Sequence, residues 1–335
     1  MTMTAVSLAV SELIPAFADV QSAAQRLSGR AIRTPLLENV QLNELCGGRV
    51  LIKAETLQRT GSFKFRGAFN LLSQIPESKK AAGVVTCSSG NHAQGVASAA
   101  AILGLKAIVV MPKDAPQIKI DNTKNYGAEV VFFDRHTESR EEIVNSIAAD
   151  SGMTFAPPYD HPHTIAGQGT CGLEIAQQAG ELGATLDTML VCCGGGGLTA
   201  GVALALSETS PNTKVYAVEP ADFDDTARSL VAEQRLSNDS SKRSICDAIL
   251  TPMPGEITFA INRTLLAGGL TVTDSEVRNA MRFAFNTLKM VVEPGGVVTL
   301  AAILSGRIET RDKVTGITLS GGNVDPAFFG SVLGG

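Results

Sequence analysis

The sequence lacks the marks of several common protein classes. It has no long run of basic residues, and 28 Lys and Arg against 33 Asp and Glu give a net charge of −5. Binding to nucleic acid needs a basic face, so we expect no nucleic-acid partner. The longest apolar run, 95–105, is about half as long as a membrane span. Residues 1–17 have no Lys or Arg before their apolar part, unlike a secretory signal, so we expect a cytoplasmic protein without membrane segments.

Paired cysteines and internal repeats are also missing. None of the six cysteines belongs to a Cys-x-x-Cys motif, which argues against a disulfide framework and indicates small buried side chains in a reducing compartment. No repeat with a period of about 20–50 residues is present, which excludes a solenoid. The length of 335 residues predicts about two domains. Because no linker rich in Ser and Pro divides the chain, these domains must be interwoven.

Short apolar, β-branched runs alternate with helical patterns along most of the chain. Strands that are apolar throughout and are joined by helices form parallel sheets covered on both faces. We therefore predict an α/β fold with two interwoven domains and open, twisted, mostly parallel sheets. The expected strands are 50–55, 83–89, 106–112, 129–134, 188–193, 214–220 and 316–322, and the expected helices include 91–104, 139–152, 167–180 and 198–209.

A row of four glycines, 194–197, follows one of the expected strands, where open parallel sheets bind their ligands. The free N–H groups and the positive end of a helix that starts near Leu198 make a cradle for a phosphate. A P-loop is excluded, because Gly-x-x-x-x-Gly-Lys-Ser/Thr is absent. The glycines and Ala200 also fit a dinucleotide motif, with Glu219 ending the next strand. An NAD-dependent dehydrogenase therefore stays open as an alternative.

Lys64 stands between two phenylalanines in the stretch GSFKFRGA, 61–68. Burial beside Phe63 and Phe65 disfavours the ammonium form and frees the amine to attack a carbonyl. A single lysine at a helix start is, by itself, more often an exposed residue. A phosphate cradle together with a lysine that forms a Schiff base is what pyridoxal phosphate requires.

Five motifs, in one order, resemble those of a known family. GSFKFRGA, SSGNHAQG, GGGGLTAG, VEPGG and SGGNVD are similar to the motifs of the fold-type-II pyridoxal-phosphate enzymes, in the branch of serine/threonine dehydratases and serine racemases. The likeness covers about residues 20–325. It implies a fold like the tryptophan synthase β-subunit, pyridoxal 5'-phosphate as cofactor and a homodimer. We expect a large cofactor-binding domain of residues 1–60 and 160–335, and a smaller domain of about 61–159 that carries the substrate-carboxylate loop.

The resemblance also implies the cofactor contacts. Lys64 would hold the cofactor and remove the Cα proton of the substrate. Phe63 would pack against the ring, Asn91 would hydrogen-bond the phenolic oxygen, and Ser320 would face the pyridine nitrogen. A neutral hydroxyl cannot hold the pyridinium proton as a carboxylate would, so the ring is a milder electron sink, which suits β-elimination. The phosphate would be bound by the backbone amides of Gly194, Gly195, Gly196, Gly197 and Leu198.

The substrate carboxylate is expected at the start of a helix, against Ser88, Ser89, Gly90, Asn91 and His92. In racemases of this family the serine that matches Ser89 acts on the face of the substrate opposite the lysine, so Ser89 is a second catalytic candidate, although dehydratases carry it too. We expect His92 to be a structural partner, since the lysine already serves as base. Arg140 matches an arginine near the side-chain end of the substrate, with an ordinary exposed helix residue as the alternative. If Arg140 faces the site, an acidic substrate such as 3-hydroxyaspartate fits.

A cation site is implied by the segment EPADFDD, 219–225. Its ligands would be the Glu219 carboxylate, the Phe223 carbonyl and the Asp225 carboxylate, a set of oxygens that suits Mg²⁺ or Ca²⁺. An acidic helix N-terminus, favoured by the helix dipole, is the alternative.

Two positions depart from the family pattern. Ala248 follows Asp247 where the family often has glycine, and the added methyl group would lie near the ring. Tyr159 stands where some racemases have a smaller polar residue, which favours the dehydratase over the racemase.

The predicted function is the β-elimination of L-serine, L-threonine or a related 3-hydroxy amino acid to a 2-oxo acid and ammonia. Serine racemase and 3-hydroxyaspartate dehydratase are alternatives within the family. An NAD-dependent dehydrogenase and a non-catalytic module that only holds the cofactor are alternatives outside this reaction class. Because the chain ends soon after SGGNVD, we expect no C-terminal regulatory domain and no feedback inhibition by isoleucine.

Overall fold

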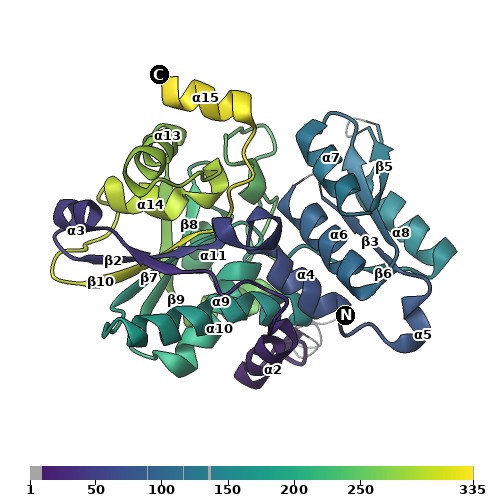
Figure 1. The fold of residues 1–335 in the computed structure, drawn as a ribbon, viewed down its shortest axis with the longest axis horizontal. Coiled ribbons are helices and arrows are strands. Elements are labelled where there is room, and N and C mark those ends of the chain that lie inside the picture. Colours follow the sequence, from purple (N-terminus) through teal and green to yellow (C-terminus); the bar gives the residue numbers. More distant parts are fainter. Residues whose placement is uncertain (1–9, 89, 116, 135–136, 335) are drawn as a thin grey trace.

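The computed structural model describes residues 10–88, 90–115, 117–134 and 137–334. These residues form two parallel-rich sheets with helices packed on their faces (Figure 1). The predicted α/β class is therefore confirmed. Within the same residues, no helix is both long enough and apolar enough to cross a bilayer.

The larger sheet has six strands in the order β1-β2-β10-β7-β8-β9, and only the β1–β2 pair is antiparallel. Its central strands are buried on both faces, which explains their uninterrupted apolar sequences. In Figure 1, β2 from the N-terminal part of the chain lies beside β10 from the C-terminal part. The strands are β1 (Leu36–Glu38), β2 (Arg49–Ala54), β7 (Thr188–Cys192), β8 (Lys214–Pro220), β9 (Leu266–Val272) and β10 (Val314–Leu319).

The smaller sheet has four parallel strands in the order β5-β4-β3-β6. All of them fall between β2 and β7 in the sequence, so the chain leaves the larger sheet once and later returns to it. The boundaries at 60/61 and 159/160 remain a prediction. The strands are β3 (Val84–Cys87), β4 (Ala107–Pro112), β5 (Glu129–Phe133) and β6 (Thr154–Phe155).

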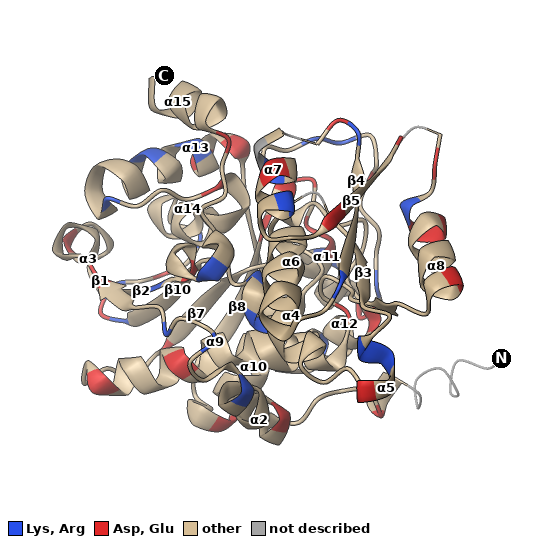
Figure 2. Cartoon of the chain, turned by 45° about the vertical axis from the view of Figure 1, so that its right-hand side comes forward, with Lys and Arg blue, Asp and Glu red and all other residues tan. Residues whose placement is uncertain are grey.

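Helices cover both sheets and join them. The α-helices are α2 (Phe17–Leu27), α3 (Val40–Cys46), α4 (Lys64–Leu72), α5 (Glu77–Lys80), α6 (Asn91–Leu103), α7 (Gln117–Asn125), α8 (Arg140–Ser151), α9 (Pro162–Glu181), α10 (Gly197–Thr209), α11 (Asp225–Ala232), α12 (Glu256–Leu265), α13 (Asp274–Phe283), α14 (Val298–Leu304) and α15 (Pro326–Gly334). Helix α6 carries no charged residue (Figure 2) and is buried over most of its length, against α4. It ends at Gly104, whose φ of +68° is a conformation that glycine adopts without strain.

The expected strands are all present, most with bounds that differ by one to three residues, and the helix expected at 167–180 is longer, Pro162–Glu181. The segment expected at 316–322 is a strand over Val314–Leu319, and the helix expected from Leu198 begins at Gly197. Strands β1, β6 and β9 were missed. The first two are only three and two residues long, too short to show a period, and β9 contains Gly268 and Gly269, which are unusual inside a strand.

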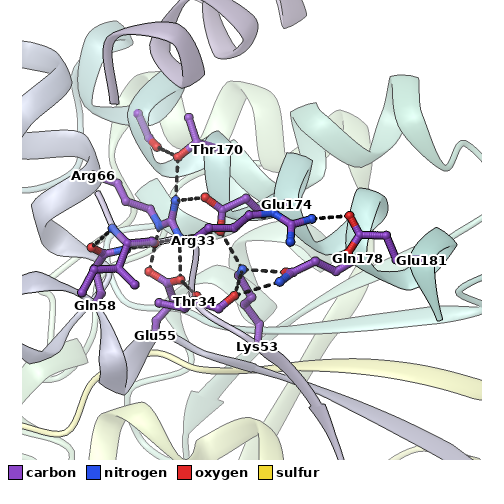
Figure 3. A network of polar contacts seen from close by, with 12 residues as sticks. Arg33, Thr34, Lys53, Glu55, Gln58, Arg66, Thr170, Glu174, Gln178 and Glu181 are labelled. Atoms are coloured by element: carbon purple, nitrogen blue, oxygen red, sulfur yellow. Dashed lines mark hydrogen bonds and ion pairs between the residues drawn. The ribbon is translucent and has the colours of Figure 1, made fainter. Parts of the chain in front are cut away.

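A buried network of ion pairs joins helix α4 to Glu55, just after β2, and to Glu174 on helix α9 (Figure 3). The Arg66 guanidinium is fully buried and donates to the carboxylates of Glu55, at 2.8 Å, and Glu174, at 2.7 Å. Lys53, on β2, donates to Glu174 at 2.6 Å and to the Thr34 carbonyl at 2.7 Å. Two cations therefore face two carboxylates inside the protein, and α4 is held against α9 and against the 3₁₀ turn Glu55–Leu57 that follows β2.

Candidate active site

A cavity of about 540 Å³ opens beyond the carboxyl ends of β3 and β7, one strand from each sheet. We call it the active-site cavity. Open parallel sheets bind ligands at this edge. The structure brings most of the predicted site residues together there: Phe63, Lys64, Ser88, Gly90, Asn91, His92, Arg140, Gly194, Gly195, Gly196, Gly197 and Leu198 all line it.

Lys64 is the first residue of α4, and its side chain is half-buried in the cavity wall. Its Nζ donates a hydrogen bond of 2.7 Å to the carbonyl of Pro158 and lies 5.2 Å from the centre of the Phe63 ring. Burial lowers the pKa of the Lys64 amine to about 8, and the nearby Glu293 only partly opposes this. An appreciable fraction of the amine is therefore neutral and nucleophilic near physiological pH.

The glycine loop joins β7 to α10 and has no room for side chains. A Cβ on Gly195 would lie 2.5 Å from the Tyr159 ring, and one on Gly196 would lie 2.8 Å from Asn262 Nδ2. Gly196 also has a φ of +89°. The Gly195 carbonyl accepts a 2.7 Å hydrogen bond from Thr258 Oγ1, and in a trans peptide the next N–H points the opposite way. The Gly196 amide therefore points away from Thr258, and α10, a helix of 13 residues, starts at the next residue. An amide beside a helix start suits a phosphate.

Asn91 and Glu293 form a polar chain beside Lys64. Asn91 Nδ2 donates to Glu293 Oε1 at 2.5 Å, and Asn91 Oδ1 accepts from Asn323 Nδ2 at 2.8 Å. Burial and the nearby Asp247 raise the pKa of Glu293 to about 7. The sequence prediction missed Glu293 and Asn323, although both lie in motifs that carry the family resemblance, VEPGG and SGGNVD.

The loop predicted to receive the substrate carboxylate lies at the start of α6. Ser88 Oγ accepts a 3.2 Å hydrogen bond from the Gly90 amide. Ser89, the second catalytic candidate, lies outside the described residues. The ring of His92 is buried, with Nε2 2.9 Å from the Ala156 carbonyl. Burial and the Lys64 charge lower the pKa of His92 to about 3, so its imidazole is neutral.

Arg140, the first residue of α8, reaches the cavity from the smaller sheet. Its side chain is 50% exposed and its Nε donates to Glu141 at 2.7 Å. Two further cations that the sequence prediction missed line the same cavity. Lys119 is paired with Asp247, and Arg235 donates to Glu256 at 2.9 Å.

Neither Ser320 nor the acidic residues Glu219 and Asp225 are among the described residues that line the cavity. Ser320 is buried just after β10, where its carbonyl accepts a 3.1 Å hydrogen bond from the Phe63 amide. The family departures Ala248 and Tyr159 do line the cavity.

Glu219 and Asp225 are both fully buried beside the larger sheet. Glu219 accepts hydrogen bonds from the amides of Thr226, at 3.0 Å, and Ala227, at 2.8 Å. Asp225 Oδ1 accepts from Asn238 Nδ2 at 2.6 Å, whereas Oδ2 has no partner. Burial raises the pKa of Asp225 to about 7 and that of Glu219 well above its usual range. Two buried carboxylates with an unsatisfied oxygen fit a bound cation, although the described chain has no cluster of three or more His, Cys, Asp or Glu side chains arranged for a metal.

Comparisons with known proteins agree with this geometry. Residues 27–321 match the family described as "Pyridoxal-phosphate dependent enzyme". The chain is 45% identical to an L-threo-3-hydroxyaspartate ammonia-lyase of a Pseudomonas species, over 96% of this chain and 99% of the relative. It is 42% identical to a serine racemase of Schizosaccharomyces pombe, over 93% and 95% of the two chains. The crystal structure of a serine racemase from Dictyostelium discoideum is 36% identical and superposes with a TM-score of 0.87, over 93% of this chain and 99% of that one.

These matches argue against the NAD-dependent dehydrogenase that the glycine loop left open. Pyridoxal phosphate needs a phosphate cradle and a reactive amine. The glycine loop 194–197 provides a cradle that any side chain would obstruct, and Lys64 provides the half-buried amine. The chain belongs to the pyridoxal-phosphate-dependent enzyme family, in the serine/threonine dehydratase and serine racemase branch of fold type II.

Proposed function

We propose that this enzyme eliminates water from L-3-hydroxy amino acids, that water then hydrolyses the product to a 2-oxo acid and ammonia, and that the enzyme prefers 3-hydroxyaspartate to serine and threonine. The observation that carries the preference is Arg140, which lines the same cavity as Lys64. A guanidinium recognises a carboxylate through paired hydrogen bonds. The 45% identity to an L-threo-3-hydroxyaspartate ammonia-lyase supports the same choice.

Pyridoxal phosphate, when bound, supplies the aldehyde and the conjugated ring that accepts the electrons of the Cα–H bond. Lys64 would hold it covalently, the loop of Gly194–Leu198 would hold its phosphate, and Phe63 would cover its ring. Ser320 is proposed to face its pyridine nitrogen from just beyond β10.

Three groups of the chain bind the substrate and move its proton. The Lys64 amine takes the Cα proton, because burial keeps it from holding its own proton tightly. The start of α6, with Ser88 to His92, binds the α-carboxylate. Arg140 binds the second carboxylate and so orients the β-hydroxyl. The hydroxyl takes up a proton and leaves as water, and this proton is balanced by the one that Lys64 removes from Cα.

We also propose a bound Mg²⁺ or Ca²⁺ at Glu219, the Phe223 carbonyl and Asp225. The support is the orphaned Oδ2 of the buried Asp225. We also propose a cytoplasmic location, because all six cysteines are free, as is usual in a reducing compartment. A homodimer is proposed from the family resemblance.

The experiment is ammonia release by the purified holoenzyme from L-threo-3-hydroxyaspartate, L-serine and L-threonine, with Lys64→Ala as the inactive control. We expect the highest kcat/KM for 3-hydroxyaspartate. Equal or higher values for serine would overturn the preference. Conversion of L-serine mainly to D-serine would overturn the elimination itself.

A further inference from the structure

Glu293 is a buried carboxylate of the cavity that the proposed function does not use. It is 2% exposed and lies between the start of α6 and the end of β10. Its Oε1 accepts the 2.5 Å hydrogen bond from Asn91. A Cβ on Gly321 would clash with this oxygen, so the glycine after Ser320 leaves the space that the carboxylate fills.

The second oxygen of Glu293 has a different environment. No described residue gives it a hydrogen bond, and Glu293 lines the active-site cavity. A buried carboxylate normally has a full set of donors or a cationic partner. Glu293 has one donor, so it is equipped to take up or release a proton rather than to stay ionised.

The charged groups around Glu293 come from three elements. Lys64 lies on α4, Asp247 on the 3₁₀ turn Asp247–Ile249, and Lys119 on α7. Lys119 is already paired with Asp247, and Lys64 donates to the Pro158 carbonyl. Among the described residues, no cation forms an ion pair with Glu293. The pKa of Glu293, about 7, follows from burial and from the negative charge of Asp247.

Asn91 would connect Glu293 to the bound cofactor. Its Oδ1 is occupied by Asn323, which is held in turn by a 2.7 Å hydrogen bond to the Thr60 carbonyl. This fixes the amide so that one N–H serves Glu293 and the second N–H is left for another acceptor. The family resemblance assigns the phenolic oxygen of the cofactor to this side chain.

We propose that Glu293 is a positioning residue that takes up or releases a proton and, through Asn91, sets the protonation state of the bound cofactor. When Glu293 is protonated, it draws less on the Asn91 amide, so the second N–H of Asn91 donates more strongly to an anionic phenolic oxygen. When Glu293 is ionised, its charge weakens that second hydrogen bond and disfavours another anion nearby. The inference rests on the proposed cofactor contacts but not on which substrate is used.

Glu293→Gln is the informative variant, because the glutamine Oε1 can still accept from Asn91 while the side chain cannot titrate. The measurement is the ratio of the visible to the near-ultraviolet absorption band of the holoenzyme as a function of pH. We expect the wild-type ratio to change with a midpoint near 7, the raised pKa of Glu293. The variant should stay constant through that range and resemble the wild type at its acid limit.

Glu141→Gln is the matched control. Glu141 also lines the cavity, but its carboxylate is bound to Arg140 and not to Asn91. We expect Glu141→Gln to keep the transition near pH 7 that Glu293 causes. A wild-type-like titration in Glu293→Gln, or loss of the transition in Glu141→Gln, would overturn the proposal. A holoenzyme that shows the expected titration but releases no ammonia would refute the proposed function and leave this inference standing.

Discussion

Lys64 and Pro158 are joined by a hydrogen bond of 2.7 Å, from the amine to a backbone carbonyl. A neutral acceptor does not hold the ammonium form as a carboxylate would, so burial decides the pKa of the amine. The residue after Pro158 is Tyr159, whose ring lies over Gly195. One short segment therefore places the reactive amine next to the phosphate cradle.

The first prediction concerns the pH dependence of cofactor uptake. Only the neutral amine of Lys64 attacks the aldehyde, and its pKa is lowered to about 8 from 10.5. The reconstitution rate of the apoenzyme, followed by stopped-flow absorbance, should rise with pH and level off once pH passes about 8. A rate that keeps rising toward pH 10.5 would show an unperturbed lysine.

The second prediction concerns the glycine loop. In Gly195→Ala the new methyl group meets the Tyr159 ring at 2.5 Å, so the loop or the ring must shift. We expect cofactor affinity to fall by about tenfold or more, which corresponds to about 1.4 kcal/mol. Gly330→Ala, where a Cβ meets nothing within 4 Å, is the control. Equal affinities in the two variants, measured by fluorescence titration, would remove the loop from the cofactor site.

The third prediction separates Arg140 from its neighbour Arg235. Arg140→Gln should lower kcat/KM for 3-hydroxyaspartate by about 10²-fold, because a charged hydrogen-bonded pair with the second carboxylate is lost. The value for serine should change by less than about threefold. Arg235→Gln should have the smaller effect on 3-hydroxyaspartate, since Arg235 donates both Nε and a terminal nitrogen, to the Pro254 carbonyl and Glu256, whereas Arg140 donates Nε to Glu141. The reverse order would assign the recognition to Arg235.

The fourth prediction concerns the cation. Mg²⁺ or Ca²⁺ at a hundredfold excess over Kd should stabilise the wild type by about 2.7 kcal/mol, seen as a higher Tm than in EDTA. Asp225→Asn should lose this response, because it removes a buried carboxylate with an open oxygen. Asp239→Asn, on the exposed surface, should keep it. A wild type that is indifferent to both cations would refute the site.

The fifth prediction concerns the buried ion network. Arg66→Met leaves the buried carboxylate of Glu55 without its guanidinium, and we expect a loss of about 3–5 kcal/mol in the free energy of unfolding. Arg33→Ala breaks an exposed pair with Glu181 and should cost less than about 1 kcal/mol. Urea denaturation of both variants measures the difference. Similar midpoints would mean that the network does not hold α4 in place.

The sequence was sufficient for the parts of this protein that depend on local pattern. Strands β7 and β8 are buried along most of their length, so their apolar runs predicted them. The four consecutive glycines and Lys64 between two phenylalanines predicted a cradle and an amine, and both line one cavity. The five motifs then identified the family.

What the sequence did not predict depends on contacts between distant residues. Lys119 and Asp247 are 128 positions apart, and nothing local to either residue indicates the ion pair. Glu293 and Asn91 are separated by 202 positions. The raised pKa of Glu293 comes from burial and from Asp247, which only the folded chain brings near. The roles of such residues become visible when their partners are known.

The most direct test of the account is borohydride reduction of the holoenzyme followed by tryptic digestion and mass spectrometry. Reduction makes the cofactor attachment permanent, and trypsin does not cut after a modified lysine. We predict one modified peptide, residues 60–66, with the added mass on Lys64. An adduct on another lysine, or no adduct in a protein that binds pyridoxal phosphate, would contradict the role of Lys64 on which the account depends.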